Sequence, residues 1–167
     1  NDEGALQWGG LVAARRYEDG RGDNTVLGPD VQWAIDGAWR LRAQWLHARS
    51  TALPDGQGGL RAGAVRDGDR LFLRLNRNVD GGESVITYED IGEGFRHDSG
   101  FVSQAGVRKL LWYEARGWRG LGPFHDFWLN VSVQRTEARG DGRTVEQAVF
   151  PGLWATAAHN VDWWLEL

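Results

Sequence analysis

The chain of 167 residues has no cysteine, no methionine, only four prolines and only four histidines. The missing cysteines exclude disulfides, thiolate catalysis and cysteine-ligated metals. The histidines, His47, His97, His125 and His159, lie far apart and form no HxH or HExxH pair, which argues against a zinc site. We therefore expect no cofactor and no bound metal.

Long apolar runs and an excess of one charge are also missing. No segment approaches the roughly 18 apolar residues that a spanning helix needs. The 19 basic and 23 acidic residues are scattered, with a net charge of −4, so no basic stripe is present to bind a phosphate backbone. No GxSxG elbow or P-loop occurs. We therefore expect neither an enzyme nor a nucleic-acid-binding protein.

Glycine and tryptophan are abundant, with 24 and 10 residues, and Asp-Gly turn signals recur along the chain. This composition is typical of strands joined by tight turns, so we expect an all-β antiparallel meander. Turn signals include Asp67-Gly68-Asp69 and Gly117. The segments between the turn signals predict about eight to ten long strands, at roughly 5–17, 24–36, 38–50, 59–67, 69–79, 83–92, 101–116, 124–138, 143–158 and 160–167.

The length suits one domain, so residues 1–167 are expected to form a single β domain. The sequence starts at Asn1 without methionine, and an alternating pattern runs to its last residue. We therefore expect the domain to be a segment of a longer chain.

Apolar and polar residues alternate in several segments, which predicts sheets with one oily face and one polar face rich in arginine. In a soluble sandwich or barrel the oily face would be the core, whereas in an outer-membrane barrel it would contact lipid. Both interpretations assign the same residues to the lipid or core face: Trp39, Leu41, Ala43, Trp45, Leu71, Leu73, Leu75, Phe127, Leu129, Val131 and Val133.

The stretch Tyr88–Arg96, with Asp98 and Gly100-Phe101-Val102, resembles a bacterial family. Its members join an N-terminal module resembling family-nine carbohydrate-binding domains to a C-terminal outer-membrane-type β-barrel domain of unknown function. The similarity covers roughly residues 24–115 and includes Asn24–Gly28, Asp30, and Gln44 through Ser50-Thr51. Ser103-Gln104 stands where the family usually has Pro-Arg.

The resemblance implies a β-barrel, or a segment of a larger barrel, in a bacterial outer membrane, with the carbohydrate-binding module outside this chain. It implies no enzyme. The expected partners are outer-membrane lipid, a glycan, and further chain segments or other subunits. The alternative is a soluble periplasmic or secreted sandwich or barrel that binds carbohydrate through exposed tryptophans.

Two local features could bind ligands. Tryptophans on or beside the polar face could stack on sugar rings, and the candidates are Trp112, Trp118, Trp128 and Trp164. Glu89, Asp90, Glu93, His97 and Asp98 form the densest group of titratable residues. Because glycines interrupt this group, we interpret 90–99 as a structural loop between two strands.

Overall fold

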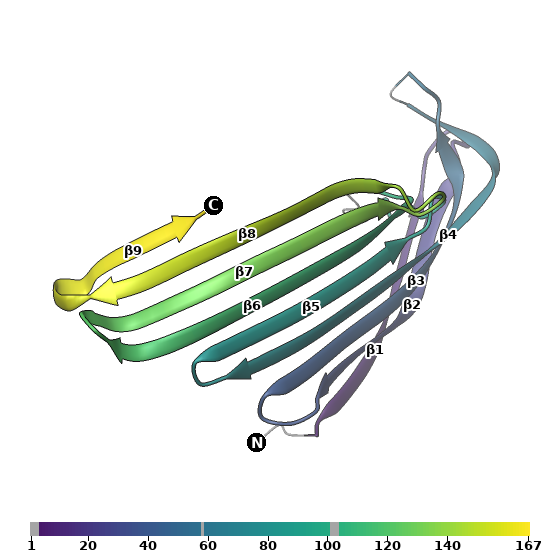
Figure 1. Ribbon diagram of the computed structural model, residues 1–167. Helices are drawn as coiled ribbons and strands as arrows, with labels where there is room; N and C mark the ends of the chain where they lie inside the picture. The colour runs from purple at the N-terminus through teal and green to yellow at the C-terminus, as the bar shows by residue number, and fades with distance from the viewer. Residues whose placement is uncertain (1–3, 58, 101–103) are drawn as a thin grey trace.

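The computed structural model describes residues 4–57, 59–100 and 104–167. They form one sheet of nine antiparallel strands, in which each strand pairs with its neighbours in the sequence (Figure 1). This confirms the expected all-β antiparallel meander. Within the described residues, β1 and β9 each have one neighbouring strand, and the sheet does not close on itself.

The strands are long, and several exceed the usual length in globular sheets. Their bounds are β1 Leu6–Arg16, β2 Asp23–Ala34, β3 Trp39–Pro54, β4 Leu60–Val79, β5 Gly82–Ile91, β6 Val107–Leu121, β7 Phe124–Ala138, β8 Thr144–Ala157 and β9 Val161–Glu166.

Helical structure in the described residues is limited to one short 3-10 turn, Ala158–Asn160, between β8 and β9. None of the helices in this part of the chain has the length and apolar character needed to cross a membrane.

Two expected turns are wrong. Gly68 lies inside β4, which runs unbroken where two strands were expected, and Gly117 lies inside β6. Each glycine leaves room for a close neighbour: a Cβ would lie 2.1 Å from the Phe95 nitrogen at Gly68, and 2.4 Å from the Trp128 ring at Gly117. The described part of the strand expected at 101–116 begins at Val107, and 101–103 lie outside the described residues.

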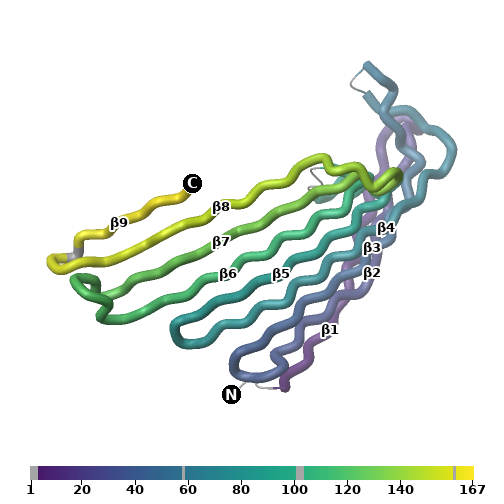
Figure 2. The backbone as a smooth tube through the Cα atoms, viewed as in Figure 1, coloured from purple at the N-terminus to yellow at the C-terminus, as the bar shows by residue number. Residues whose placement is uncertain are grey.

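Short turns join β2 to β3, β4 to β5 and β6 to β7 at one end of the sheet, which we call the turn end. The opposite end, the loop end, carries the 92–106 connection and the tip of the β3–β4 hairpin. This hairpin extends beyond the other strands (Figure 2). Outer-membrane barrels have the same asymmetry between short turns and longer loops.

The strands are staggered relative to one another. The row of paired residues that starts at Ala34, the last residue of β2, reaches Phe150 in β8. Strand β8 continues seven residues further, to Ala157, before its turn. Over six strand spacings this stagger corresponds to a tilt of about 40°, which is in the range found in barrel walls.

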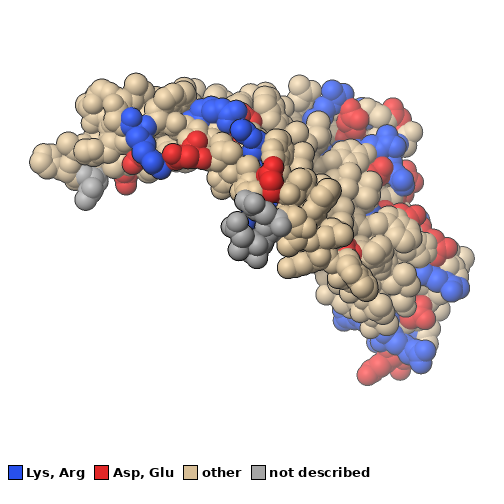
Figure 3. Space-filling view, turned by 90° about the horizontal axis from the view of Figure 1, so that it is seen from below, with Lys and Arg blue, Asp and Glu red and all other residues tan. Residues whose placement is uncertain are grey.

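The sheet also bends into an open arch (Figure 3). The loop after β5 contacts residues of β1–β3, although β1 lies four strands away. A loop can span that separation only across the hollow side of a curved sheet. The face that receives this loop is therefore the concave face, and the opposite face is convex.

Candidate functional site

The convex face is covered by apolar side chains that continue from strand to strand. Paired residues in antiparallel strands point to the same face, so the register defines each row. One row contains eight apolar residues on eight strands and no polar residue: Leu6, Trp33, Leu41, Leu75, Ile86, Trp112, Val133 and Val149.

All the residues expected on the lipid or core face lie on this convex face. Ala43 pairs with Leu73 and Trp45 with Leu71. Val133 shares a row with Leu41 and Leu75, and the other three β7 residues precede it at alternate positions and so point to the same face. No second layer of the described residues covers them, and Leu73 is 36% exposed. The apolar face is thus an outer surface of this sheet.

Charged residues on the convex face gather toward the loop end and are largely paired there. His47 lies 2.9 Å from Asp69, and Asp90 lies 3.3 Å from Arg108 and 2.8 Å from Arg139. Nearer the turn end are Arg77, which lies over the Trp39 ring, and the ion pair of Glu114 with Arg116. Between the loop end and these residues, the face is an apolar band.

The concave face is polar in its central rows. One row contains Gln7, Gln32, Arg42, Arg74, Thr87, Leu111 and Gln134. Arg42 and Arg74 are directly opposite each other, an arrangement of like charges that weakens a strand pair. A cavity of about 670 Å³ lies on this side, and its lining combines polar residues such as Glu83 and Glu89 with apolar residues such as Val85 and Leu111. This face suits contact with water.

Near the loop end the concave face carries a small apolar core. It consists of Val26, Leu46, Ala48, Ile91, Phe95 and Val107. Phe95, which is 3% exposed, comes from the loop after β5. The backbone there passes so close to β4 that a Cβ on Gly94 would lie 2.0 Å from the Asp67 oxygen. Glycines 68 and 94 thus allow residues 92–98, the infolded loop, to lie directly on the sheet.

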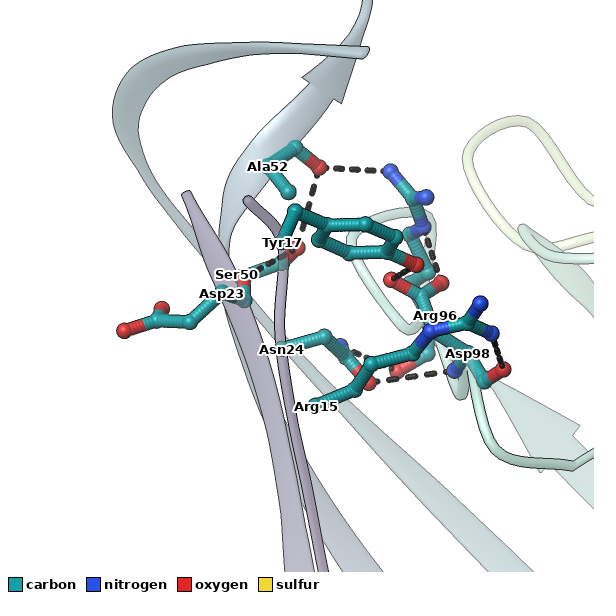
Figure 4. Close-up of polar contacts among 8 residues, drawn as sticks. All are labelled: Arg15, Tyr17, Asp23, Asn24, Ser50, Ala52, Arg96 and Asp98. Carbon is teal, nitrogen blue, oxygen red and sulfur yellow. Dashed lines mark hydrogen bonds and ion pairs between the residues drawn. The ribbon is translucent and has the colours of Figure 1, made fainter. Parts of the chain in front are cut away.

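Polar contacts fasten the infolded loop to β1–β3 (Figure 4). Asn24, buried in β2, donates to the Arg96 carbonyl at 3.0 Å and accepts from the Asp98 backbone N–H at 3.1 Å. Arg96 donates to the carbonyl of Ala52 and pairs with the Asp98 carboxylate. These contacts connect the infolded loop to β2 and β3.

Tyr17 adds a contact from the loop that follows β1. Its hydroxyl donates to the Asp98 carboxylate at 2.8 Å, and Arg15 donates to the Asp98 carbonyl at 2.9 Å. Partial burial, together with the hydrogen bond to Asp98, raises the pKa of Tyr17 above its ordinary value. The neutral phenol is therefore the form that fits this contact.

The acidic group Glu89–Asp98 is dispersed rather than gathered. Glu89 points to the concave face and pairs with Arg70, whereas Asp90 points to the convex face and pairs with arginines. Asp98 faces Tyr17 and Arg96. Across residues 4–57, 59–100 and 104–167, no three Asp, Glu or His side chains converge as a metal site would require.

The four candidate stacking tryptophans lie on two different faces. Trp112 pairs with Ile86 and Trp118 with Phe127 on the convex face, so their expected place on or beside the polar face is wrong. Trp128 and Trp164 lie on the concave face, as expected. Whether any of the four stacks on sugar stays a prediction.

Trp154, which lies between Trp128 and Trp164, was not among the residues predicted from the sequence. The folding of residues 92–98 onto the sheet was not predicted either. Gly92 and Gly94 were the sequence signal for this folding. Glycine occurs both in turns and where two backbones approach closely, so the sequence does not distinguish the two cases.

No protein-family model, curated protein or solved structure matches the chain.

Proposed function

We propose that this chain forms part of the wall of a non-enzymatic β-barrel in a bacterial outer membrane. The convex face contacts lipid and the concave face lines a water-filled lumen. The observation that carries the proposal is the apolar row that crosses eight strands without interruption on the convex face.

Two further features support this proposal. Hydrocarbon is a favourable environment for an apolar surface of this extent, whereas soluble monomers rarely expose one larger than a few hundred Å². The band lies between charged side chains toward the loop end and aromatic side chains toward the turn end. The aromatic rings are those of Trp33, Trp39, Trp118, Phe127 and Trp163. Such a band with an aromatic girdle is typical of barrels that span a bilayer.

In this proposal the infolded loop lies inside the lumen and narrows it near the loop end. Phe95 anchors the loop in the small apolar core, and Asn24 and Arg96 connect it to the wall. The edges at β1 and β9 would pair with further chain segments or other subunits, because open strand edges do not occur in lipid. The family resemblance implies a glycan-binding module elsewhere.

The alternative is a soluble periplasmic or secreted protein that binds carbohydrate. It requires another layer of protein over the convex face to form a core. The exposed tryptophans on the concave face are the observation that favours it.

Neighbouring residues on opposite faces allow a direct test. The chain has no native cysteine, so Leu73→Cys and Arg74→Cys each give a single labelling site. Each variant is spin-labelled and reconstituted in phospholipid vesicles. The accessibility of the label to oxygen, which concentrates in lipid, is then compared with its accessibility to a water-soluble nickel chelate.

We expect the Leu73→Cys label to be open to oxygen and closed to nickel, and the Arg74→Cys label to be open to nickel. A Leu73→Cys label that is closed to both reagents would indicate a protein core and favour the soluble alternative. A label at this position that is open to nickel would overturn both interpretations.

A further inference from the structure

Three tryptophans form one row on the concave face near the turn end. Trp128 in β7 pairs with Trp154 in β8, which pairs with Trp164 in β9. Trp128 lies against Gly117, where a Cβ would come within 2.4 Å of its ring. Trp154 is 36% exposed and Trp164 is 72% exposed, so both keep ring surface free for a ligand. The row is an aromatic surface at the turn end of the concave face.

Hydrogen-bonding groups surround this aromatic row. Asp126 lies one position along the face from Trp128, and Asn130 lies on its other side. Beside Trp154 and Trp164, the Thr156 hydroxyl donates to the Asp162 carboxylate at 2.7 Å. Carboxylates and amides next to exposed rings provide acceptors and donors for hydroxyl groups.

The surface beside Trp128 is hollowed. A cavity of about 500 Å³ is lined by Trp128 together with Arg40, Asn76, Asn78 and Asp80. A second cavity, of about 360 Å³, shares Trp128 and Asp80 and adds Asp126 and Arg119. Asp80 and Arg119 already form an ion pair at 2.9 Å. The hollows combine amide, guanidinium and carboxylate groups with the ring of Trp128, and Trp118 also lines the second cavity.

We propose that this end of the concave face binds a neutral oligosaccharide. Indole rings stack on the C–H faces of pyranose rings, and the flanking polar groups hydrogen-bond the hydroxyls. Adjacent strands lie about 4.8 Å apart, so rings on β7, β8 and β9 can contact successive sugar units. The inference rests on the proposed function only in placing the row inside a lumen.

The chain supplies its own matched controls. Trp154→Ala and Trp164→Ala each remove an indole from the row, whereas Trp33→Ala and Trp112→Ala remove one from the convex face. Binding of maltohexaose, cellohexaose and chitohexaose is measured by titration calorimetry on the full chain. The detergent is an amine oxide, because glycoside detergents would compete. Circular dichroism verifies that each variant folds.

We expect at least one hexasaccharide to bind, with affinity reduced roughly tenfold in Trp154→Ala and Trp164→Ala and unchanged in the convex-face variants. Failure of all three sugars to bind would overturn the inference, as would an equal loss in all four variants. The spin-label experiment reports on lipid contact without any sugar, so failure of the proposed function is distinguishable from failure of this one.

Discussion

At the scale of single residues, the medium around the convex face determines what a substitution does. Leu73 lies at the middle of the Leu71, Leu73, Leu75 face and pairs with Ala43 and Tyr88. In lipid, Leu73→Arg should lower the free energy of unfolding by about 2–4 kcal/mol. Leu73→Ala should lower it little, because a lipid tail fills the vacated space. In a protein core, Leu73→Ala alone would cost about 2–5 kcal/mol. Equilibrium unfolding in detergent micelles measures both changes.

We expect both Leu73 variants to fold, with a small penalty for alanine. Loss of folded protein in both variants would contradict lipid contact and favour the soluble alternative.

Tyr17 makes the infolded loop sensitive to alkaline pH. Its pKa is raised in the folded state, so the neutral phenol contributes stability that is fully present below its ordinary value of about 10. This contribution is lost as the pH rises through the higher folded value, because the phenolate then faces the Asp98 carboxylate. Urea midpoints measured across this alkaline range should fall more steeply in the native chain than in Tyr17→Phe. If the urea midpoints of the native chain and of Tyr17→Phe changed in parallel with pH, the contact between Tyr17 and Asp98 would add no stability.

At the scale of strands and loops, glycines determine where two backbones can touch. Gly68→Ala would place a methyl group 2.1 Å from the backbone nitrogen of Phe95. Neither backbone can yield easily, so we expect a loss of about 1–3 kcal/mol and a displaced infolded loop. In the native chain the Arg96 side chain is held by Ala52 and Asp98. Displacement of the loop would release this side chain, so trypsin should cleave after Arg96 faster.

Gly10→Ala in β1 is the matched control, because its Cβ would meet only an ordinary contact at 3.5 Å. Equal cleavage rates in the two variants would contradict the close approach.

The same glycines explain what the sequence could predict. Alternation in 39–45 and 127–133 predicted the convex face, because a strand has a fixed period of two. Turns were predicted at Gly68 and Gly117, because the sequence does not distinguish a glycine that permits a turn from one that makes space for a neighbour. The face of Trp112 was misassigned because Leu110 and Leu111, which precede it, are both apolar and obscure the alternation.

Sequence patterns also could not place the infolded loop. Asn24 and Asp98 meet through contacts between residues more than 70 positions apart. Those contacts depend on the curvature of the sheet, which no single strand determines. The concave tryptophan row has the same origin, because the register of β7, β8 and β9 aligns its members.

At the scale of the whole molecule, the proposal predicts resistance to denaturing detergent. Closed barrels keep all backbone hydrogen bonds satisfied internally and unfold slowly in such detergents. The barrel that this chain forms with the segments paired to β1 and β9 should require detergent for solubility and should migrate faster unheated than boiled on a denaturing gel. Identical mobility in both lanes, with no need for detergent, would count against the outer-membrane interpretation.

The meander order also determines how the sheet would come apart under force. Every strand pairs only with its sequence neighbours, so pulling on the C-terminus loads the bonds between β8 and β9 first. That pair has six matched positions, against 15 between β3 and β4. Unfolding in an optical trap should therefore proceed as a series of separate hairpin ruptures, with the β9 step at the lowest force. The infolded loop should resist as a later step, because it connects β5 to β1 and β2.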